Sequence, residues 1–412
     1  MTTTEDSGRI TLIGAGPPPV RKDVVVWSWV IGATLSWFGD TVFSVALAWT
    51  AVQELRPALA ALVVGVGMVP QALLMLPGGV LADRLDTRRL MITGEIGRVL
   101  ILIAGAVAWL AGVNGAVVLF SVALIFGVVA GLSNPARSTL IRQLVRTEDL
   151  VTVGGWIQIG NRIARLGGAP VGAVVVGVGG IVPAMLINAV TFASIAALLM
   201  IMIRPRFRLP RRSDQSPWEG LKDGLSYLAR TPTARTLTLG LCALNVFSTP
   251  VIAIGVAMRV SDAGWGPTWV GIAEAALAVG AIAGSVLAIR WRGDHLARRA
   301  FWTLVLQGVA LAAIGLPTRP TLIAGMIMVG VTAGLASVWL GGTFQATIAA
   351  NYLGRVSSAN QLGDLALTPL VLPAFGAIAG RFDLLVATLI CGIAMAILCS
   401  YFATRQEIRT LT

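Results

Sequence analysis

Gly78-Gly79-Val80-Leu81-Ala82-Asp83-Arg84-Leu85-Asp86-Thr87-Arg88-Arg89-Leu90 forms a short charged break between two long apolar runs. Two acids and three arginines stand in a link too short to be a domain, which predicts a tight cytoplasmic hairpin between two membrane helices. Gly78 and Gly79 would let the helix end lie close to a neighbour. Asp83 could accept hydrogen bonds at the N-terminus of another helix and so latch two bundles together; alternatively, these charges only set the membrane orientation.

The composition indicates a polytopic membrane protein. Of the 412 residues, 56% are hydrophobic and 12% are charged, and the mean hydropathy is +0.83; soluble domains carry about 25% charged residues. The net charge of +12 does not indicate nucleic-acid binding, because most arginines gather in alternate loops. The cysteines (Cys242, Cys391 and Cys399) lie in apolar segments and His295 lies alone in a charged loop, so neither disulfides nor a metal site are expected.

Apolar segments long enough to cross a bilayer of about 30 Å recur along the chain. We place them near residues 24–51, 58–82, 90–112, 115–138, 152–178, 181–203, 236–259, 268–290, 300–316, 321–348, 358–380 and 383–404. The sequence therefore predicts an all-α polytopic protein with twelve transmembrane helices.

The distribution of basic residues predicts the orientation. With the N-terminus taken as cytoplasmic, 24 of the 31 Lys and Arg residues fall on the inner side, four fall on the outer side, and Arg98, Arg162 and Arg165 lie within helices. This bias predicts that both termini are cytoplasmic. The expected organisation is a tail (1–23), a six-helix bundle (24–203), a linker (204–235), a second six-helix bundle (236–404) and a short tail (405–412).

Within the linker, Trp218, Leu221, Leu225 and Leu228 recur at helical spacing. This periodicity predicts an amphipathic helix on the inner membrane surface.

The two bundles resemble each other in sequence. Gly78–Arg84 matches Gly284–Arg290 at an offset of 206 residues. The first helix contains Asp40-Thr41-Val42-Phe43-Ser44, and the seventh contains Asn245-Val246-Phe247-Ser248 at nearly the same place. Two related halves about an axis along the membrane normal are typical of alternating-access carriers.

The charged loop resembles the major facilitator superfamily motif G-x-x-x-D-R-x-G-R-R, which Gly79, Asp83, Arg84 and Arg88 meet. Asp86 replaces the usual glycine, which makes the turn less tolerant of positive φ. Thr87 replaces the first paired arginine, and Arg89 supplies that charge two places later. The resemblance implies the twelve-helix fold of that superfamily and a transport function.

Four further stretches resemble the bacterial drug:proton antiporter branch that includes macrolide and siderophore exporters. They are Gly39-Asp40 with Ala46-Leu47-Ala48-Trp49, Asn134-Pro135-Ala136-Arg137, Gly354-Arg355-Val356-Ser357-Ser358 and Trp218-Glu219-Gly220-Leu221. The export motif of that branch, G-P-x-x-G-G, is altered to Gly167-Gly168-Ala169-Pro170-Val171-Gly172, with the proline displaced. Its glycines would still permit close packing, and Pro170 could kink the helix.

Ionisable residues inside membrane helices are costly, so each is a candidate for function. Asp40, about 24 Å along the first helix, is a candidate proton or cationic-substrate site; the alternative is a structural carboxylate paired with an arginine. Glu95 and Arg98 share one helix face and are expected to form a charge lock with Arg84, Arg88 or Asp83, rather than a transport site.

Arg162 and Arg165 lie three residues apart in the fifth helix and need anionic partners. Asp40 and Glu274 are the candidates, because the fold implied by the resemblance packs helix five beside helices one and eight. Proton-driven release of an arginine and static pairing both remain open. Glu274, near the outer end of helix eight, and Asp364, near the inner end of helix eleven, are possible gates, and Asp364 would approach the loop latch.

Buried amides and aromatics are candidates for the substrate cavity, although both commonly serve packing instead. The candidates are Trp37, Phe43, Gln158, Asn161, Asn245, Phe247 and Gln345.

The sequence predicts a secondary transporter of a bacterial cytoplasmic (inner) membrane that exports a lipophilic compound, such as a drug or antibiotic, by proton antiport. Its expected partners are the substrate, protons and membrane lipids, without nucleic acid, and a monomer is expected. No phosphate-binding loop is present, so neither ATP nor another cofactor is expected. The alternatives are a lipid or lysolipid flippase of the same fold, a siderophore or metabolite exporter, a solute importer, and an intramembrane enzyme, which the lone His295 disfavours.

Overall fold

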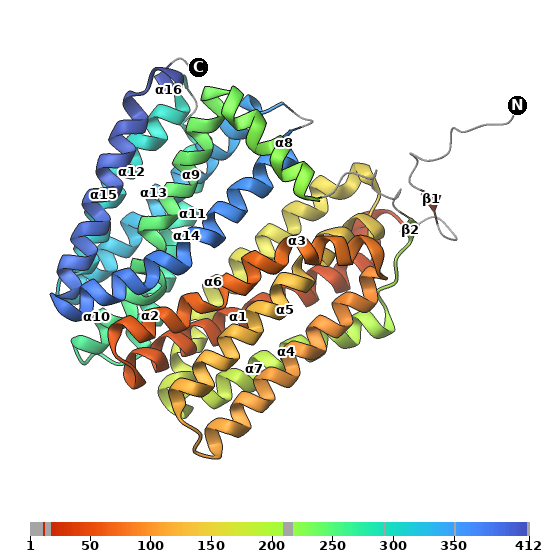
Figure 1. The fold of residues 1–412 in the computed structure, drawn as a ribbon, viewed down its shortest axis with the longest axis horizontal. Coiled ribbons are helices and arrows are strands. Elements are labelled where there is room, and N and C mark those ends of the chain that lie inside the picture. Colours follow the sequence, from red (N-terminus) through yellow and green to blue (C-terminus); the bar gives the residue numbers. More distant parts are fainter. Residues whose placement is uncertain (1–10, 13–17, 209–216, 292, 350–351, 410–412) are drawn as a thin grey trace, which may run out of the picture.

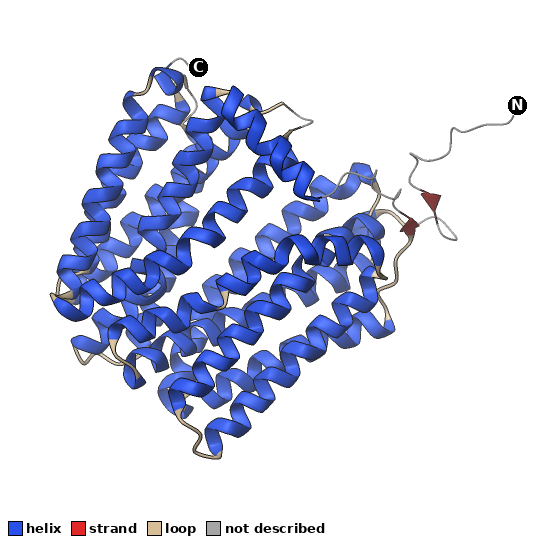
Figure 2. Ribbon diagram, in the orientation of Figure 1, coloured by secondary structure: helices blue, strands red, loops and turns tan. Residues whose placement is uncertain are grey.

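The computed structural model describes residues 11–12, 18–208, 217–291, 293–349 and 352–409, and helices dominate it (Figure 2). Twelve helical segments of the described residues are long and apolar enough to span a membrane, which confirms the predicted number. Two two-residue strands, β1 (Thr11–Leu12) and β2 (Phe207–Arg208), pair antiparallel outside these spans.

The first bundle holds six of the spans (Figure 1). Its helices are α1 (Val24–Glu54), α2 (Pro57–Val66), α3 (Met68–Arg84), α4 (Thr87–Leu110), α5 (Gly115–Leu144), α6 (Leu150–Gly179) and α7 (Ile181–Ile201). Two 3-10 turns, η1 (Val20–Lys22) and η2 (Thr147–Asp149), precede α1 and α6. The predicted fourth segment ended at residue 138, but α5 continues to Leu144, so Arg137 lies within the helix and not at its end.

The second bundle holds the other six spans. Its helices are α9 (Pro232–Pro250), η3 (Val251–Gly255), α10 (Val256–Asp262), α11 (Thr268–Arg290), α12 (Leu296–Ile314), α13 (Arg319–Thr347), α14 (Leu353–Arg381) and α15 (Leu384–Thr404), followed by the short α16 (Gln406–Arg409). We call the end at which α1 begins and α15 ends the terminus end, and the other the opposite end.

Two spans are interrupted where the sequence weakens the regular helix. The second span breaks at Gly67, where an added Cβ would lie 2.5 Å from the Ala123 carbonyl oxygen, so only glycine allows α5 to approach this closely. The seventh span contains the π-helical turn η3 directly after Pro250, which lacks the N–H of a regular helix. Ile252 and Ala253 of this turn face the space between the bundles.

Equivalent helix contacts in the two bundles support the internal repeat. Gly78 in α3 lies against the Gly131 carbonyl of α5, and Gly284 in α11 lies against the Val331 carbonyl of α13. Both glycines let a helix backbone pack directly on its neighbour. Gly79, by contrast, has nothing near its missing Cβ, so of the two predicted packing glycines only Gly78 serves that role.

The predicted linker helix is present as α8 (Pro217–Arg230), although the side chains of Trp218 and Leu221 lie outside the described residues. Leu228 is buried and Leu225 is exposed. Tyr227 stacks on Tyr352 at 4.4 Å between ring centroids. The helix thus docks on the start of α14, in addition to any contact with a membrane surface.

Asp23 fixes the start of α1. Its carboxylate accepts hydrogen bonds from the Val25 and Val26 amides and forms a two-pronged ion pair with Arg206, which follows α7. Burial acts to raise the pKa of Asp23, but the Arg206 hydrogen bond and charge, together with the two amides, outweigh it and hold the pKa below its ordinary value.

This ion pair predicts acid sensitivity at the terminus end. A carboxyl with a lowered pKa contributes stability above its unfolded pKa of about 4 and loses it as the pH falls further. In purified protein, we expect the difference in unfolding temperature between wild type and Asp23→Asn to be present at neutral pH and to shrink below about pH 4. A constant difference down to pH 3 would contradict this role for the ion pair.

Candidate functional site

A large cavity lies between the two bundles. Its volume is about 900 Å³, and α1, α6, α9, η3, α11 and α13 supply most of its wall. The wall is mainly apolar and built from small side chains, with four charged residues among its lining: Asp40, Arg162, Arg165 and Glu274. Its size falls within the range of drug-sized ligand sites.

Close packing between the bundles closes the opposite end of the molecule. Gln53 at the end of α1 donates a hydrogen bond to Ser261 in α10 over 2.8 Å. Gly376 of α14 lies so near α2 that an added Cβ would fall 2.5 Å from the Pro57 carbonyl oxygen. From this contact the two bundles diverge toward the terminus end (Figure 1).

Gly376→Val is expected to open this contact, because its branched side chain has no space against the α2 backbone. A cysteine at cavity residue Ser248, in an otherwise cysteine-free chain, should then react faster with an impermeant maleimide applied from the opposite end. Gly342→Val in α13 is the matched control, since nothing lies within 4 Å of its missing Cβ. Equal reactivity in both variants would contradict the assigned closure.

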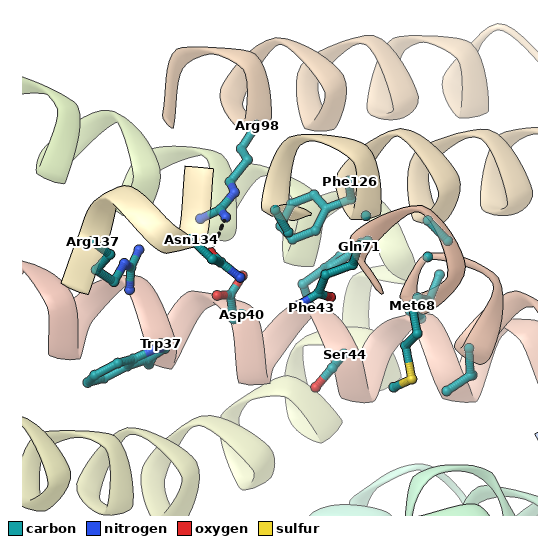
Figure 3. Close-up of a pocket in the computed structure, with 16 residues that line it drawn as sticks. Trp37, Asp40, Phe43, Ser44, Met68, Gln71, Arg98, Phe126, Asn134 and Arg137 are labelled. Carbon is teal, nitrogen blue, oxygen red and sulfur yellow. Dashed lines mark hydrogen bonds between the residues drawn. The ribbon is translucent and has the colours of Figure 1, made fainter. Parts of the chain in front are cut away.

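Asp40 lies near the middle of α1 and lines two cavities at once. One is the central cavity, and the other, of about 350 Å³, lies within the first bundle beside Arg98 and Arg137 (Figure 3). Its Oδ1 accepts a hydrogen bond from Asn188 Nδ2 of α7 at 3.3 Å. Gly39 makes this possible, because an added Cβ there would lie 2.6 Å from Asn188 Oδ1.

A buried charge network stands beside Asp40. Glu95 of α4 pairs with Arg98 Nη1 at 3.4 Å and with Arg137 Nη2 at 3.1 Å. Arg98 also donates to Asn134 Oδ1 at 3.0 Å, and Asn134 lies next to Asp40 (Figure 3). Glu95 and Arg98 are almost fully buried, with side chains 2% and 4% exposed. We call Asp40, Glu95, Arg98 and Arg137, which carry two negative and two positive charges, the α1–α4–α5 network.

This geometry corrects two expectations. Glu95 and Arg98 do form an ion pair, but the third member is Arg137 and not Arg88. Asp40 shares the smaller cavity with Arg98 and Arg137, and no ion pair joins it to Arg162 or Arg165 within the described part of the chain. Although all three residues line the central cavity, the carboxylate of Asp40 is hydrogen-bonded to Asn188 of α7, whereas Arg162 is hydrogen-bonded to Ser285 of the second bundle.

Arg162 and Arg165 are exposed to the central cavity. Arg162 Nη1 donates to Ser285 Oγ of α11 at 3.5 Å, and Arg165 Nε donates to Asn161 Oδ1 at 3.1 Å. Glu274 of α11, a helix that packs against α6, interacts with Arg165 electrostatically but beyond ion-pair distance. Of the two anionic partners expected for these arginines, Asp40 and Glu274, only Glu274 interacts with one of them, Arg165.

Asp364 forms a separate polar contact within the second bundle. Its Oδ2 accepts a hydrogen bond from Asn245 Nδ2 of α9 at 3.0 Å, and its buried Oδ1 has no hydrogen-bond partner among the described residues. The residue lies eleven positions after the start of α14 at Leu353. It is therefore deeper in the bundle than the position expected for a contact with the charged loop.

In the charged loop, the described side chains bind within the first bundle. Arg88 donates to the Leu199 and Met200 carbonyls at the end of α7, both at 2.7 Å, and so caps that helix. Asp86 accepts from the Arg89 amide and caps α4, while the Arg89 side chain is exposed. The side chains of Asp83 and Arg84 lie outside the described residues, so the proposed latch remains a prediction.

Some of the predicted substrate-cavity residues line one of the two cavities, and the others line neither. Trp37, Asn161 and Asn245 line the central cavity, and Phe43 lines the smaller one. Phe247 packs against the core, and Gln158 and Gln345 are exposed away from both cavities.

Sequence reasoning missed three polar residues that the structure brings to Asp40. Arg137 was counted only among the basic residues of the inner side. Asn134 was used only for the family resemblance, because a single amide beside a proline carries little signal. Asn188 stands within an apolar run, where a buried amide indicates a helix–helix hydrogen bond and could have been included.

The proteins to which this chain is similar are membrane transporters. The sequence model of the Major Facilitator Superfamily matches residues 29–366, and the chain belongs to that family. It is 25% identical over 391 residues to the uncharacterized MFS-type transporter YfiS of Bacillus subtilis (strain 168), covering 91% of each chain.

Solved transporters share the fold. A bacterial homologue of the human lysosomal transporter Spinster, inward-facing and unoccupied, superposes with a TM-score of 0.73 at 16% identity, covering 96% of this chain and 98% of its own. The nucleoside transporter NupG gives 0.68 at 16% identity, with 94% and 100% coverage. A bacterial homologue of the iron transporter ferroportin, inward-facing, gives 0.67 at 18% identity, with 92% and 99% coverage.

Proposed function

We propose that this chain is a proton-coupled exporter of lipophilic small molecules, with Asp40 as its proton-binding carboxyl. The observation that carries this proposal is the position of Asp40, which lines the central cavity and the α1–α4–α5 network at once. A proton bound there would change the charge balance of the network and the surface that a substrate meets.

The network supplies a physical route for coupling. With Asp40 ionised, its charge and that of Glu95 balance Arg98 and Arg137; with Asp40 protonated, one positive charge in the membrane interior is uncompensated. Because such a charge is costly in a membrane, the network would favour the conformation that rehydrates or re-pairs it. Since α1 also forms part of the closed opposite end through Gln53, a shift at Asp40 acts on a helix that both bundles contact.

The cavity supports a lipophilic substrate. Small and aliphatic side chains of α11 and α13 make up much of the wall of the second bundle, including Ala278, Ala281, Ala333 and Gly334. Such a surface accommodates different apolar shapes without a fixed pattern of hydrogen bonds. The excess of basic residues at the terminus end supports a cytoplasmic location for that end in a bacterial inner membrane, so the cavity described here would receive its substrate from the cytoplasm.

The test is transport by purified chain in proteoliposomes with an imposed pH gradient and a clamped membrane potential. The panel contains macrolides, tetracyclines, dansyl-labelled lipophiles of different charge and a fluorescent lysolipid. Movement of at least one lipophile that depends on the gradient, and stops with a protonophore, is the expected result. Lysolipid transfer indifferent to pH, without movement of any other probe, would overturn the proposal in favour of a lipid carrier.

A further inference from the structure

Two arginines in the central cavity have donors left unused. Arg162 and Arg165 lie three residues apart on one face of α6, and each makes one hydrogen bond, at 3.5 Å to Ser285 and at 3.1 Å to Asn161. A guanidinium group carries five N–H donors. Within the described part of the chain, no carboxylate lies within ion-pair distance of either arginine.

The carboxylates of the cavity do not supply the missing anion. Asp40 is held by Asn188 and lies beside Arg98 and Arg137. Glu274 reaches Arg165 only through a longer electrostatic interaction and makes no direct ion pair with it. Charged groups inside a membrane protein ordinarily pair with one another or mark the path of a substrate. Two exposed guanidinium groups on the wall of a cavity of about 900 Å³ therefore point to a ligand.

We propose that Arg162 and Arg165 form an anion-binding subsite, so that the transported molecule is an amphiphile with a carboxylate or phosphate group. This inference rests on the proposed transport function. Arginine recognises both groups through paired N–H donors, and two arginines at this spacing can bind one anion together. The apolar part of the molecule then lies against the small side chains of α11 and α13, among them Ala281, Gly330 and Ala333.

The charge of such a substrate agrees with export in exchange for protons. With the terminus end in the cytoplasm, an anion leaves the cell in the direction that an inside-negative potential favours. The proton moves inward along the same potential. Each half of the exchange is therefore favourable with respect to the potential.

The experiment measures binding to the purified full chain in lipid nanodiscs. The probes are dansyl-undecanoate, its neutral methyl ester and a dansyl alkylamine of the same length. A charge-assisted hydrogen bond contributes about 1.5–3 kcal/mol, so the wild type should bind the carboxylate about tenfold to a hundredfold more tightly than the ester. Arg162→Gln and Arg165→Gln should each remove most of that preference, so that the affinity for the carboxylate falls toward that for the ester.

Two further variants sharpen the assignment. Arg142→Gln changes an exposed arginine at the terminus end of α5, outside the cavity, and should preserve the preference. Glu274→Gln removes the carboxylate that competes for Arg165 and should tighten binding of the carboxylate probe. Competition by a lysophosphatidic acid distinguishes a lipid headgroup from a free acid: displacement of the carboxylate probe by it, and not by octyl phosphate, identifies a lipid substrate.

The outcomes separate the two proposals. Equal affinity of wild type for carboxylate and ester, binding of neither probe, or parallel loss of both in the arginine variants would overturn the anion subsite. If the preference is found but no probe moves with the pH gradient, the subsite stands and the exporter proposal fails. If gradient-driven transport favours the amine probe and Arg162→Gln does not alter it, the exporter stands and the subsite fails.

Discussion

Asp40→Asn is expected to abolish proton-driven accumulation while substrate exchange continues. A pH difference of one unit supplies about 1.4 kcal/mol for each exchanged proton, which supports a roughly tenfold concentration ratio of substrate. An amide cannot take up and release that proton, so the ratio should fall to about one. The measurement is the steady-state ratio of a transported probe in proteoliposomes at clamped potential, together with counterflow at equal pH on both sides.

Glu54→Gln is the matched control, because it makes the same chemical change at an exposed end of α1, outside both cavities. This variant should accumulate substrate as the wild type does. Full accumulation by Asp40→Asn would remove the proton site from Asp40 and transfer the proposal to Glu274 or Asp364. Loss of counterflow as well would show that Asp40 is needed for substrate binding or folding, and not for coupling alone.

Glu95→Gln is expected to cause the largest loss of stability among single isosteric changes. Glu95 is the carboxylate paired with both Arg98 and Arg137, and its side chain is only 2% exposed. Removing one partner of a buried ion pair costs about 3–5 kcal/mol, because the remaining charge is left uncompensated. The apparent unfolding temperature in detergent should fall clearly, as measured by the temperature dependence of the monodisperse peak in size-exclusion chromatography.

Glu148→Gln makes the same substitution at a solvent-exposed pair with Arg146, where an ion pair contributes about 0–1 kcal/mol. Its unfolding temperature should match the wild type. Adding Arg98→Met to Glu95→Gln removes one uncompensated cation, so the double variant should recover part of the loss. An unchanged unfolding temperature in Glu95→Gln would contradict the view that Glu95 stabilises the protein by compensating the charges of Arg98 and Arg137.

The fold was predictable because the length and hydropathy of membrane-spanning helices can be recognised in the sequence. The twelve spans, the two halves and the charged hairpin after α3 all follow from runs of apolar residues and from the basic residues between them. The break at Gly67 was not predicted, because it depends on the close approach of α5. The π-helical turn after Pro250 was not predicted either, although the proline is a local signal for an irregular helix. Arg137 shows the main limit: a basic residue near a span end can belong to a loop or, as here, to a helix with a buried partner.

The site was predictable in its members more than in its pairings. Asp40, Glu95, Arg98, Arg162, Arg165 and Glu274 were all selected as costly charges within the membrane, and all six lie in or beside the two cavities. Which carboxylate faces which arginine depends on the rotation of each helix about its own axis. One sequence leaves that rotation open, and the structure directs Asp40 toward α5 and α7 and the α6 arginines toward the second bundle.

The most direct test of proton coupling through Asp40 is to measure whether a substrate gradient moves protons across the membrane. Proteoliposomes at equal internal and external pH, with a clamped potential and a pH-sensitive dye inside, receive a gradient of the probe that the wild type transports best. We expect proton movement opposite to the substrate in the wild type and none in Asp40→Asn, while probe exchange continues in both. Substrate movement without protons in the wild type, or unchanged proton movement in Asp40→Asn, would contradict the account.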